Sequence, residues 1–298
     1  MMKQLLLIMN PAAGTKKANP HLPEILSVFG AAGYACLTFM TRKRGDGTTL
    51  AAQYAAQVDL IVCIGGDGTF NEVISGVVSA GAATPIGYIP AGSTNDFAAS
   101  LGLSKNVVQA AKDIAAGHPM PYDVGRFRNR YFTYVASFGA FTKTSYATSQ
   151  SVKNALGHLA YVLEGIREIT SLHRYHVAVT LDDERREEGD YIFGAVSNST
   201  SVGGILTLDK NVVDMNDGLF ELLLVKYPRN MSELAEVIMA LTTQKYDSPS
   251  LIFRPAKKLQ VTADPGMDWT LDGEFAKGSE RIEIENLHSA VRIMVNEK

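Results

Sequence analysis

The stretch Gly65-Gly66-Asp67-Gly68-Thr69-Phe70-Asn71-Glu72-Val73 decides how the first part of this chain folds. It follows the apolar run at residues 59–64, which is typical of a buried strand, and it leads into a helical pattern that starts near Asn71. Closely spaced glycines let another group approach the backbone, and the unpaired amides at a helix start bind phosphate oxygens. The stretch therefore predicts a strand, a phosphate-binding turn and a helix. The alternative is a tight turn that needs glycine only for its shape.

Two further features of this turn bear on its chemistry. Asp67 and Glu72 are carboxylates beside the predicted phosphate site, so they are candidate metal ligands, directly or through water. The turn lacks the Gly-Lys-Ser/Thr ending of a Walker A loop and the glycine spacing of a dinucleotide-binding fold. A phosphate-binding turn of another kind is indicated.

Two more polar turns follow predicted strands in the same part of the chain. Gly92-Ser93-Thr94-Asn95-Asp96 follows a short strand at residues 85–90, and Asn10-Pro11-Ala12-Ala13-Gly14 follows a strand at residues 3–9. Because parallel strands end at one edge of a sheet, where α/β proteins bind ligands, we expect the three turns to line one crevice. Residues 93–96 also fit a helix N-cap, and a cap can face a ligand at the same time.

The first third of the chain alternates apolar strands with helical patterns. Strands are predicted over residues 3–9, 34–40, 59–64 and 85–90, and helices over residues 21–33, 50–58, from 71 onward, and 107–117. Strands separated by helices of this length imply right-handed crossovers and a mostly parallel sheet. This pattern predicts an N-terminal α/β domain over residues 1–124.

After Asp123 the pattern changes to strands separated by turns. Strands are predicted over residues 126–137, 175–182, 190–198, 219–226, 257–263 and 281–295, with helices over 151–172 and 231–241. This pattern predicts a mainly antiparallel, β-rich and sandwich-like C-terminal domain over residues 125–298. The last strand, near residues 288–298, can return to the first domain.

Composition excludes several classes of protein. The chain has 298 residues, enough for two domains, and its 46% hydrophobic and 20% charged residues exclude a disordered or fibrous chain. Its 28 basic and 31 acidic residues give a net charge of −3, so we expect no nucleic-acid partner. The apolar run Leu5–Met9 is too short for a bilayer span or a signal peptide, so we expect a cytoplasmic protein. Cys36 and Cys63 have neither a metal spacing nor a disulfide framework.

With the motifs that come later in the chain, the sequence resembles the catalytic domain of the diacylglycerol kinase and sphingosine kinase family, especially its soluble bacterial lipid kinases. The matching stretches span nearly the whole chain: Asn10-Pro11 with Gly14, Gly65–Val73, Gly92–Ala98, Asp123-Val124-Gly125, Gly203-Gly204, Asn216-Asp217-Gly218-Leu219 and Leu271-Asp272-Gly273-Glu274. The resemblance implies a nucleotide-binding α/β domain, a β-rich domain for the lipid substrate and the catalytic base, and an active site in the cleft between them.

The resemblance also implies which residues bind ATP and which residue acts as the general base that takes the proton of the attacking hydroxyl. The residues expected at the ATP site are Asn10, Thr41, Gly65, Gly66, Asp67, Gly68, Thr69, Asn71, Glu72, Gly92, Ser93 and Asn95. Asp272 corresponds to the family's proposed general base, and Glu274 shares its face if the segment is extended. Apart from the resemblance, Asp272-Gly273 is more typical of a hairpin turn than of a catalytic site.

Two magnesium sites follow from the resemblance. Asp67, Asp96 and Asp123 would surround the catalytic Mg²⁺, partly through water, because Mg²⁺ sites keep several waters and use few carboxylates. A separate structural Mg²⁺ is expected at Asp217, with backbone carbonyls from Asp214 and Leu219. The alternative for residues 216–218 is a plain Asn-Asp-Gly turn.

The function that this resemblance implies is an ATP-dependent lipid kinase that phosphorylates a hydroxyl of diacylglycerol or a related lipid, giving a product such as phosphatidic acid. One alternative is a kinase of a soluble substrate related to NAD kinase, which shares a Gly-Gly-Asp-Gly-Thr turn. Another is a nucleotide-binding regulator without catalysis, against which the acidic residues at the predicted site argue. The oligomeric state stays open, with a homodimer as one arrangement.

A lipid kinase without a transmembrane segment takes its substrate from a membrane surface, so we expect transient peripheral association with the membrane. The basic runs Lys16-Lys17 and Arg42-Lys43-Arg44 are candidates for contact with phosphates or with anionic lipid, and they are equally typical of a solvated face. The apolar residues in the predicted helix over 151–172 are consistent with a flap over an acyl-chain pocket or with ordinary core packing.

Overall fold

The computed structural model describes residues 2–14, 18–139, 169–182, 185–198, 201–202, 206–207, 216–243 and 245–296. The helix predicted over 151–172 lies outside these residues, apart from the short 3-10 helix η4 (Ile169–Ser171). Lys16-Lys17, Gly203-Gly204 and Asp214 also lie outside them. The chain divides into two compact units, unit 1 (Met1–Tyr122 with Ser289–Lys298) and unit 2 (Asp123–His288).

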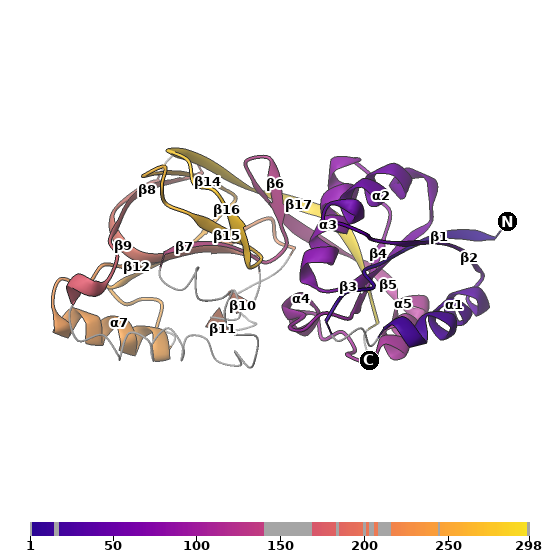
Figure 1. Cartoon of the computed structure of the whole chain (residues 1–298). Helices are drawn as coiled ribbons and strands as arrows, with labels where there is room; N and C mark the ends of the chain where they lie inside the picture. The colour runs from indigo at the N-terminus through magenta and orange to yellow at the C-terminus, as the bar shows by residue number, and fades with distance from the viewer. Residues whose placement is uncertain are drawn as a thin grey trace. The chain divides into compact units, whose positions relative to one another are not determined.

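Unit 1 is an α/β unit built on parallel strands (Figure 1). Its sheet runs in the order β2-β1-β3-β4-β17, and each of these neighbouring pairs is parallel. Its elements are β1 (Lys3–Met9), η1 (Asn19–His21), α1 (Leu22–Ala31), β2 (Tyr34–Met40), α2 (Asp46–Tyr54), η2 (Ala55–Gln57), β3 (Leu60–Gly65), α3 (Asp67–Ser79), β4 (Ile86–Pro90), α4 (Asp96–Ser100), α5 (Val107–Ala116) and the first part of β5 (His118–Phe127).

Both faces of this sheet are covered, which explains why its strands are apolar without interruption. Leu5 and Leu7 of β1 share a core cluster with Ile25 and Phe29 of α1 and with Ile114 of α5. The alternate side chains of β1 point the other way, because successive residues of a strand face opposite sides of the sheet. In Figure 1, α1 and α5 cover one face, and α2 and α3 cover the other. The predicted α/β fold is confirmed.

Two helices start earlier than predicted. Helix α3 starts at Asp67 instead of near Asn71, because the amide of Phe70 already donates to the carbonyl of Gly66. The polar residues of the glycine-rich stretch therefore form the first turn of the helix. Helix α2 starts at Asp46 instead of Leu50. Its first turn is polar and carries no apolar periodicity, so the pattern missed it.

Unit 2 consists mainly of antiparallel strands. It holds the end of β5, β6 (Arg130–Phe132), β7 (Val135–Gly139), β8 (Tyr175–Leu181), β9 (Arg185–Ser197), β10 (Ser201–Val202), β11 (Leu206–Thr207), β12 (Phe220–Lys226), α7 (Met231–Thr243), β13 (Leu251–Ala256), β14 (Lys258–Ala263), β15 (Trp269–Leu271), β16 (Glu274–Ala276) and the first part of β17 (Arg281–Val295). The strand predicted over 126–137 is in fact the end of β5, then β6, then the start of β7. A turn with Arg128 at φ 55° separates the first two.

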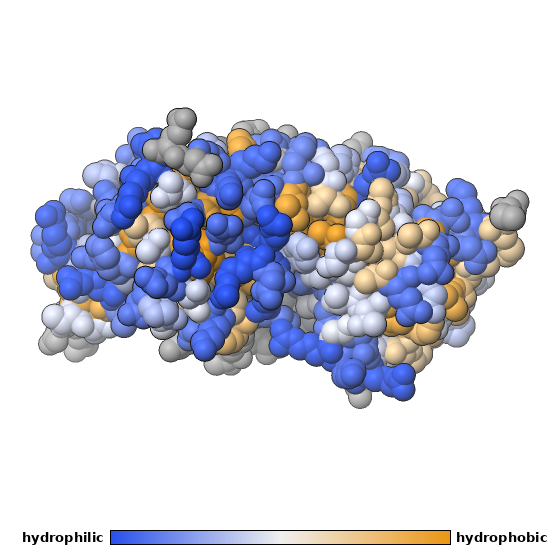
Figure 2. Space-filling model, turned by 90° about the horizontal axis from the view of Figure 1, so that it is seen from above, coloured by the Kyte–Doolittle hydropathy of each residue, from blue (hydrophilic) through white to orange (hydrophobic). Residues whose placement is uncertain are grey.

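The long strand β9 joins two parts of this sheet. Residues 185–191 pair with β8, whereas residues 193–197 pair with β7 on one side and β12 on the other. An apolar cluster, with Phe138, Trp269 and Leu224 among its members, packs against these strands. Figure 2 shows mainly hydrophilic residues on the visible face of unit 2. This is the predicted β-rich, antiparallel and sandwich-like part of the fold.

The last strand pairs with strands of both units, so the strands of unit 1 and the main strands of unit 2 belong to one hydrogen-bonded sheet. Residues 281–285 of β17 pair with β14 in unit 2, and Ile293 pairs in parallel with Ile86 of β4 in unit 1. The chain crosses between the units twice, at Tyr122/Asp123 in β5 and at His288/Ser289 in β17.

Substitutions at two glycines of unit 1 test how closely its helices pack. A Cβ on Gly76 of α3 would lie 2.4 Å from the carbonyl oxygen of Thr48 and 2.7 Å from Cβ of Ala51, both on α2. Gly76→Ala is therefore expected to lower the free energy of unfolding by about 1–3 kcal/mol, because the two helices must separate.

The matched control is Gly30→Ala in α1, where a Cβ meets no heavy atom of the described chain within 4 Å. This variant is expected to gain about 0.5–1 kcal/mol from the higher helix propensity of alanine. Urea denaturation measures both values, and equal stability of the two variants would contradict the close α2–α3 contact.

Candidate active site

The turns after β1, β3 and β4 meet at their glycines. A Cβ on Gly92 would lie 2.5 Å from Cα of Gly66, and a Cβ on Gly14 would lie 2.5 Å from the carbonyl oxygen of Ala91. Gly14 also has a φ of 50°, in the left-handed region that glycine occupies without strain. The three polar turns therefore lie side by side at the carboxyl ends of the strands, with no room for side chains where they touch.

Asp67 ties two of these turns together. Its Oδ2 accepts from the amide of Asp96 at 3.0 Å, and its Oδ1 accepts from the amide of Phe97 at 3.3 Å. These amides begin helix α4, so a carboxylate from the first turn of α3 caps a helix that is distant in sequence. The hydroxyl of Tyr88, on β4, lies 3.5 Å from Oδ1 of Asp67 and 3.3 Å from Oδ1 of Asn95.

This arrangement places two acids close together in a sheltered position. Burial, with the negative charge of Asp96 as the second cause, raises the pKa of Asp67 to about 6, although the hydrogen bonds to its carboxylate oppose the shift. Burial also raises the pKa of Asp96. A pair of carboxylates that resists ionisation is stabilised in its charged form by a cation nearby.

The remaining predicted ATP-site residues of unit 1 lie around the same turns. The side-chain amide of Asn10 donates to Oγ1 of Thr69 at 3.1 Å, and the amide of Thr41 donates to the carbonyl of Met9 at 2.9 Å. Asn95 has a φ of 57°, and its side chain exchanges hydrogen bonds with the amide and carbonyl of Gly92 at 2.9 and 2.8 Å. Ser93 is exposed beside it. Asn71, one turn into α3, accepts a long hydrogen bond of 3.4 Å from the hydroxyl of Ser75.

Glu72 has a structural partner that the sequence does not reveal. Its two carboxylate oxygens accept from the amides of Gly45 and Gly47 at 2.8 and 3.0 Å. Asp46 likewise accepts from the amides of Arg42 and Lys43, and these bonds lower its pKa. The two acids thus fix the backbone of the basic loop, while the side chains of residues 42–44 remain exposed.

In unit 2, Asp272 lies in the tight turn between β15 and β16 with a φ of 49°. Its carboxylate accepts four hydrogen bonds, from the amide and hydroxyl of Thr133 at 2.6 and 2.8 Å and from the amides of Tyr134 and Val135 at 3.0 Å each. Burial raises the pKa of Asp272, and these hydrogen bonds oppose that shift. Asp272-Gly273 therefore forms the hairpin turn of the alternative interpretation. The carboxylate of Asp272 also binds residues 133–135, which lead into the neighbouring strand β7.

Glu274 lies two residues beyond Asp272, at the start of β16. Nη2 of Arg130 lies 3.4 Å from its Oε2, and Nη1 of the same arginine donates to the carbonyl of Phe275 at 2.8 Å. The segment from Arg130 to Val135 therefore contacts the hairpin from both the Asp272 side and the Glu274 side.

Asp123 is fully buried and belongs to unit 2. Its Oδ2 accepts from the amide of Gly218 at 2.8 Å, and its Oδ1 lies 3.0 Å from Nδ1 of His288. Asp217 accepts from the amide of Leu219 at 2.8 Å, and the carbonyl of Leu219 accepts from the side chain of Asn286 at 3.0 Å. The predicted metal residues of unit 2 thus build an Asn-Asp-Gly turn that Asp123 holds in place.

The described residues contain no group of three or more His, Cys, Asp or Glu side chains arranged to hold a metal ion. Two neighbouring carboxylates, Asp67 and Asp96, still fit Mg²⁺, which commonly takes one or two protein carboxylates and completes its shell with water and substrate phosphates. The donor chemistry suits a hard cation that arrives with a nucleotide.

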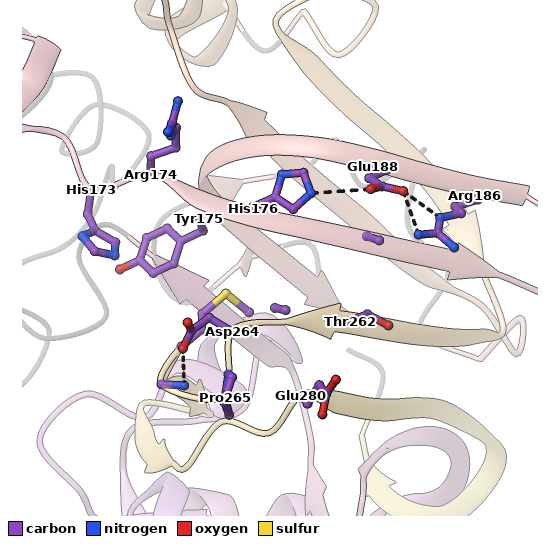
Figure 3. Close-up of a pocket in the computed structure, with 14 residues that line it drawn as sticks. His173, Arg174, Tyr175, His176, Arg186, Glu188, Thr262, Asp264, Pro265 and Glu280 are labelled. Atoms are coloured by element: carbon purple, nitrogen blue, oxygen red, sulfur yellow. Dashed lines mark hydrogen bonds and ion pairs between the residues drawn. The ribbon is translucent and has the colours of Figure 1, made fainter.

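A pocket of about 780 Å³ lies elsewhere in unit 2 and includes none of the predicted site residues (Figure 3). Some of its charged groups form ion pairs: Nδ1 of His176 lies 2.9 Å from Asp190, its Nε2 lies 3.5 Å from Glu188, and Arg186 lies 2.7 Å from Glu188. These carboxylates raise the pKa of His176, the hydrogen bond to Asp190 contributing most. The carboxylates of Asp264 and Glu280 also line the pocket.

Several residues that shape the site were missed by sequence reasoning. Tyr88 is hidden in an apolar strand, and Asp46 lies in a stretch without periodicity. Thr133 and Arg130 lie more than 130 residues before the acids that they contact. A periodic pattern or a local motif gives no signal for such distant pairs.

Comparison with known proteins defines the class first. The model of the diacylglycerol kinase catalytic domain matches residues 4–127, and that of the YegS C-terminal NAD kinase beta sandwich-like domain matches residues 135–295. A protein named diacylglycerol kinase from Bacillus subtilis is 33% identical over 297 residues, which cover 99% of this chain and 97% of that relative. The chain belongs to the diacylglycerol kinase family, as its motifs predicted.

Solved structures agree on the fold. A structure of a diacylglycerol kinase from Bacillus anthracis matches with a TM-score of 0.75 at 24% identity, over 99% of this chain and 97% of that one. An NAD kinase from Archaeoglobus fulgidus in complex with ATP matches with a TM-score of 0.56 at 12% identity, over 99% and 94%. Among the helices of the described residues, none has both the length and the apolar character to span a bilayer.

The Asp67–Asp96 pair predicts a pH-dependent stability. The pKa of Asp67 is raised to about 6 in the folded state, so folding favours its protonated form. Without divalent cations, the contribution of Asp67 to the free energy of unfolding should fall by about 2–3 kcal/mol as the pH rises from 4 to 7, because the unfolded chain loses this proton more readily.

Asp96→Asn should reduce this loss, because it removes the neighbouring negative charge. Denaturation at both pH values measures the effect, with Asp247→Asn at an exposed position as the control. An unchanged pH dependence in Asp96→Asn would show that the two acids do not interact.

Proposed function

We propose that this chain transfers the γ-phosphoryl group of ATP to the hydroxyl of diacylglycerol, giving phosphatidic acid and ADP. The observation that carries the proposal is the contact of three glycine-containing turns, two of which lead into helices, in a chain whose relatives are named diacylglycerol kinase over nearly its whole length. Phosphoryl transfer needs positioned phosphates, a cation and a base for the attacking hydroxyl, and the two units offer residues for each.

Unit 1 supplies the nucleotide site in this proposal. The first amides of α3 have no acceptor within their own helix, so they are oriented to receive phosphate oxygens, whereas the amides of Asp96 and Phe97 that begin α4 are held by Asp67. The close approach of Gly66 and Gly92 keeps the turns free of side chains where the phosphates would lie. The other residues proposed at this site are Asn10, Thr41, Gly65, Asp67, Gly68, Thr69, Asn71, Glu72, Ser93 and Asn95, of which Glu72 acts by fixing the loop at residues 45–47.

Asp67 and Asp96 would hold Mg²⁺ beside the phosphates. When bound, the cation would neutralise charge that builds up on the transferring phosphoryl group. Asp123 is also proposed among the acids around this cation, and its two oxygens hold Gly218 and His288. The second, structural Mg²⁺ stays a proposal for Asp217 and the carbonyl of Leu219, with Asp214 as a further ligand.

Asp272 is the proposed general base, which takes the proton from the lipid hydroxyl. Its raised pKa suits a base better than that of an exposed aspartate, because a more basic carboxylate accepts a proton more readily. Glu274 is proposed to orient the substrate beside it, held in turn by Arg130.

The lipid reaches this site from a membrane surface in the proposed reaction. The exposed basic loop at residues 42–44 directly follows β2, an edge strand whose Leu37 and Met40 are 42% and 51% exposed. Basic side chains next to exposed apolar ones suit a surface that carries anionic headgroups above acyl chains.

The proposed function is tested by offering the purified chain labelled ATP and Mg²⁺ with diacylglycerol, sphingosine or NAD⁺. Label in phosphatidic acid is expected. Label in NADP⁺ alone would support the alternative of a soluble-substrate kinase, and nucleotide binding without transfer would support a regulator.

Asp272→Asn is expected to lower kcat by about 10²–10⁴-fold, because an amide cannot take the proton of the attacking hydroxyl. It is also expected to lower the melting temperature, since an amide NH₂ would face backbone N–H donors that now meet a carboxylate.

Asp182→Asn is the matched control for this variant. Asp182 also has a positive φ, of 47°, and also accepts backbone amides, from Lys257 and Lys258. It should lose stability and keep kcat. If both variants lose the same fraction of kcat at a temperature where both are folded, Asp272 has no special part in the chemistry.

Changing Arg42, Lys43 and Arg44 together to Ser should reduce activity on diacylglycerol in anionic vesicles. Each cation near such a surface contributes about 1 kcal/mol, and salt should screen the effect. Turnover of a short-chain, water-dispersed diacylglycerol serves as the control and should change little. Equal losses on both substrates would assign the loop to the nucleotide, and no loss on either would remove it from function.

A further inference from the structure

The four hydrogen bonds that the carboxylate of Asp272 accepts use the lone pairs that a substrate hydroxyl would need. A carboxylate has two lone pairs on each oxygen. Oδ1 receives the amides of Tyr134 and Val135, and Oδ2 receives the amide and the hydroxyl of Thr133. A lipid hydroxyl that gives its proton to Asp272 must therefore displace one of these four donors.

Three of the four donors are fixed by the sheet. The amides of residues 133–135 lead into β7, which pairs with β9 through Val135 and with β15 through Ala136. The amide of Asp272 also donates back to the carbonyl of Val135 at 2.9 Å. Moving any of these amides would break strand pairing on both sides of β7.

The fourth donor, the hydroxyl of Thr133, can turn away by rotation of a single side-chain bond. Thr133 is buried, with 2% of its surface exposed, and its Oγ1 lies 2.8 Å from Oδ2. We infer that Thr133 is the positioning residue for Asp272: its hydroxyl holds Oδ2 until the lipid hydroxyl takes its place. This inference rests on the proposed function, in which Asp272 is the base.

The step itself balances without any further reactant. The lipid hydroxyl donates to Oδ2 and passes its proton there as its oxygen bonds to the γ-phosphorus of ATP. The bond from that phosphorus to the bridging oxygen breaks, and ADP leaves with the electron pair. Thr133 takes no part in these bonds and acts only through Asp272.

The charged groups that flank this turn among the described residues are Arg130 and Glu274. They pair with each other at 3.4 Å, and Nη1 of Arg130 also donates to the carbonyl of Phe275. The hydroxyl of Thr133 contacts the carboxylate of Asp272 directly, so a change at Thr133 alters the surroundings of that carboxylate.

Thr133→Val is the variant that tests the inference, because valine has nearly the same shape and no hydroxyl. Loss of a hydrogen bond to the charged carboxylate raises the pKa of Asp272, so the base ionises only at higher pH. The expected result is a kcat/KM, which reports ionisation of the free enzyme, that falls about tenfold at the acidic end of the pH profile and stays close to wild type on the alkaline plateau. Thr133→Ser, which restores the hydroxyl, should restore the wild-type profile.

Thr270→Val is the matched control. Thr270 is also a buried threonine in this sheet, 6% exposed, and its hydroxyl lies 2.8 Å from that of Ser137. This variant should lower the melting temperature and leave the shape of the pH profile unchanged. A uniform loss of kcat/KM at every pH in Thr133→Val, or a profile identical to wild type, would overturn the inference.

A measurement without substrates separates this inference from the proposed function. A ¹³C NMR titration of the aspartate carboxyls, assigned with Asp272→Asn, should show the Asp272 signal titrating at higher pH in Thr133→Val than in wild type. If that shift occurs and no phosphatidic acid forms in wild type, the proposed function fails while the link between Thr133 and Asp272 stands. If phosphatidic acid forms and the shift is absent, the inference fails alone.

Discussion

The contact between Gly66 and Gly92 is the constraint on which unit 1 depends. Two turns that end neighbouring strands approach so closely that a Cβ on Gly92 would lie 2.5 Å from Cα of Gly66. Neither turn can move without changing the register at the ends of β3 and β4. The first turn of α3 and the start of α4 are thereby held next to each other, and Asp67 spans the distance between them with two hydrogen bonds. A rigid backbone, free of side chains at its centre, is what binding of several phosphate oxygens requires.

Three carboxylates at the proposed site accept hydrogen bonds from backbone amides. Glu72 holds the loop at Gly45 and Gly47, Asp67 holds the start of α4, and Asp272 holds the start of β7. Such contacts have a double effect. They fix loops that carry functional groups, and at Asp67 and Asp272 they oppose the rise in pKa that burial causes. A hydrogen bond that positions a carboxylate therefore also affects its pKa. In the proposed mechanism, the hydroxyl of Thr133 does both for Asp272.

Much of the fold could be predicted because the signals for it are local. The apolar runs at residues 3–9 and 59–64 and the helical periodicity between them determine a parallel α/β unit, and the three glycine turns follow from its topology. The strand over 126–137 and the start of α3 were predicted less well, since turn residues within these stretches blur the pattern. Contacts between distant residues, such as Thr133 with Asp272 or Asp123 with His288, could not be predicted, because they depend on how the strands pair. The family resemblance identified the acids, but it could not show which of them are engaged by amides.

The central claim is that ATP binds where Gly66 and Gly92 meet. Calorimetric titration of ATP into Gly92→Ala tests it most directly, with Gly30→Ala as the control for a glycine that has open space around it. The account predicts that Gly92→Ala loses most of its affinity for ATP while it stays folded, because the added methyl group pushes the two turns apart, and that Gly30→Ala binds like wild type. Wild-type affinity for ATP in folded Gly92→Ala would contradict it and would place the nucleotide elsewhere in the protein.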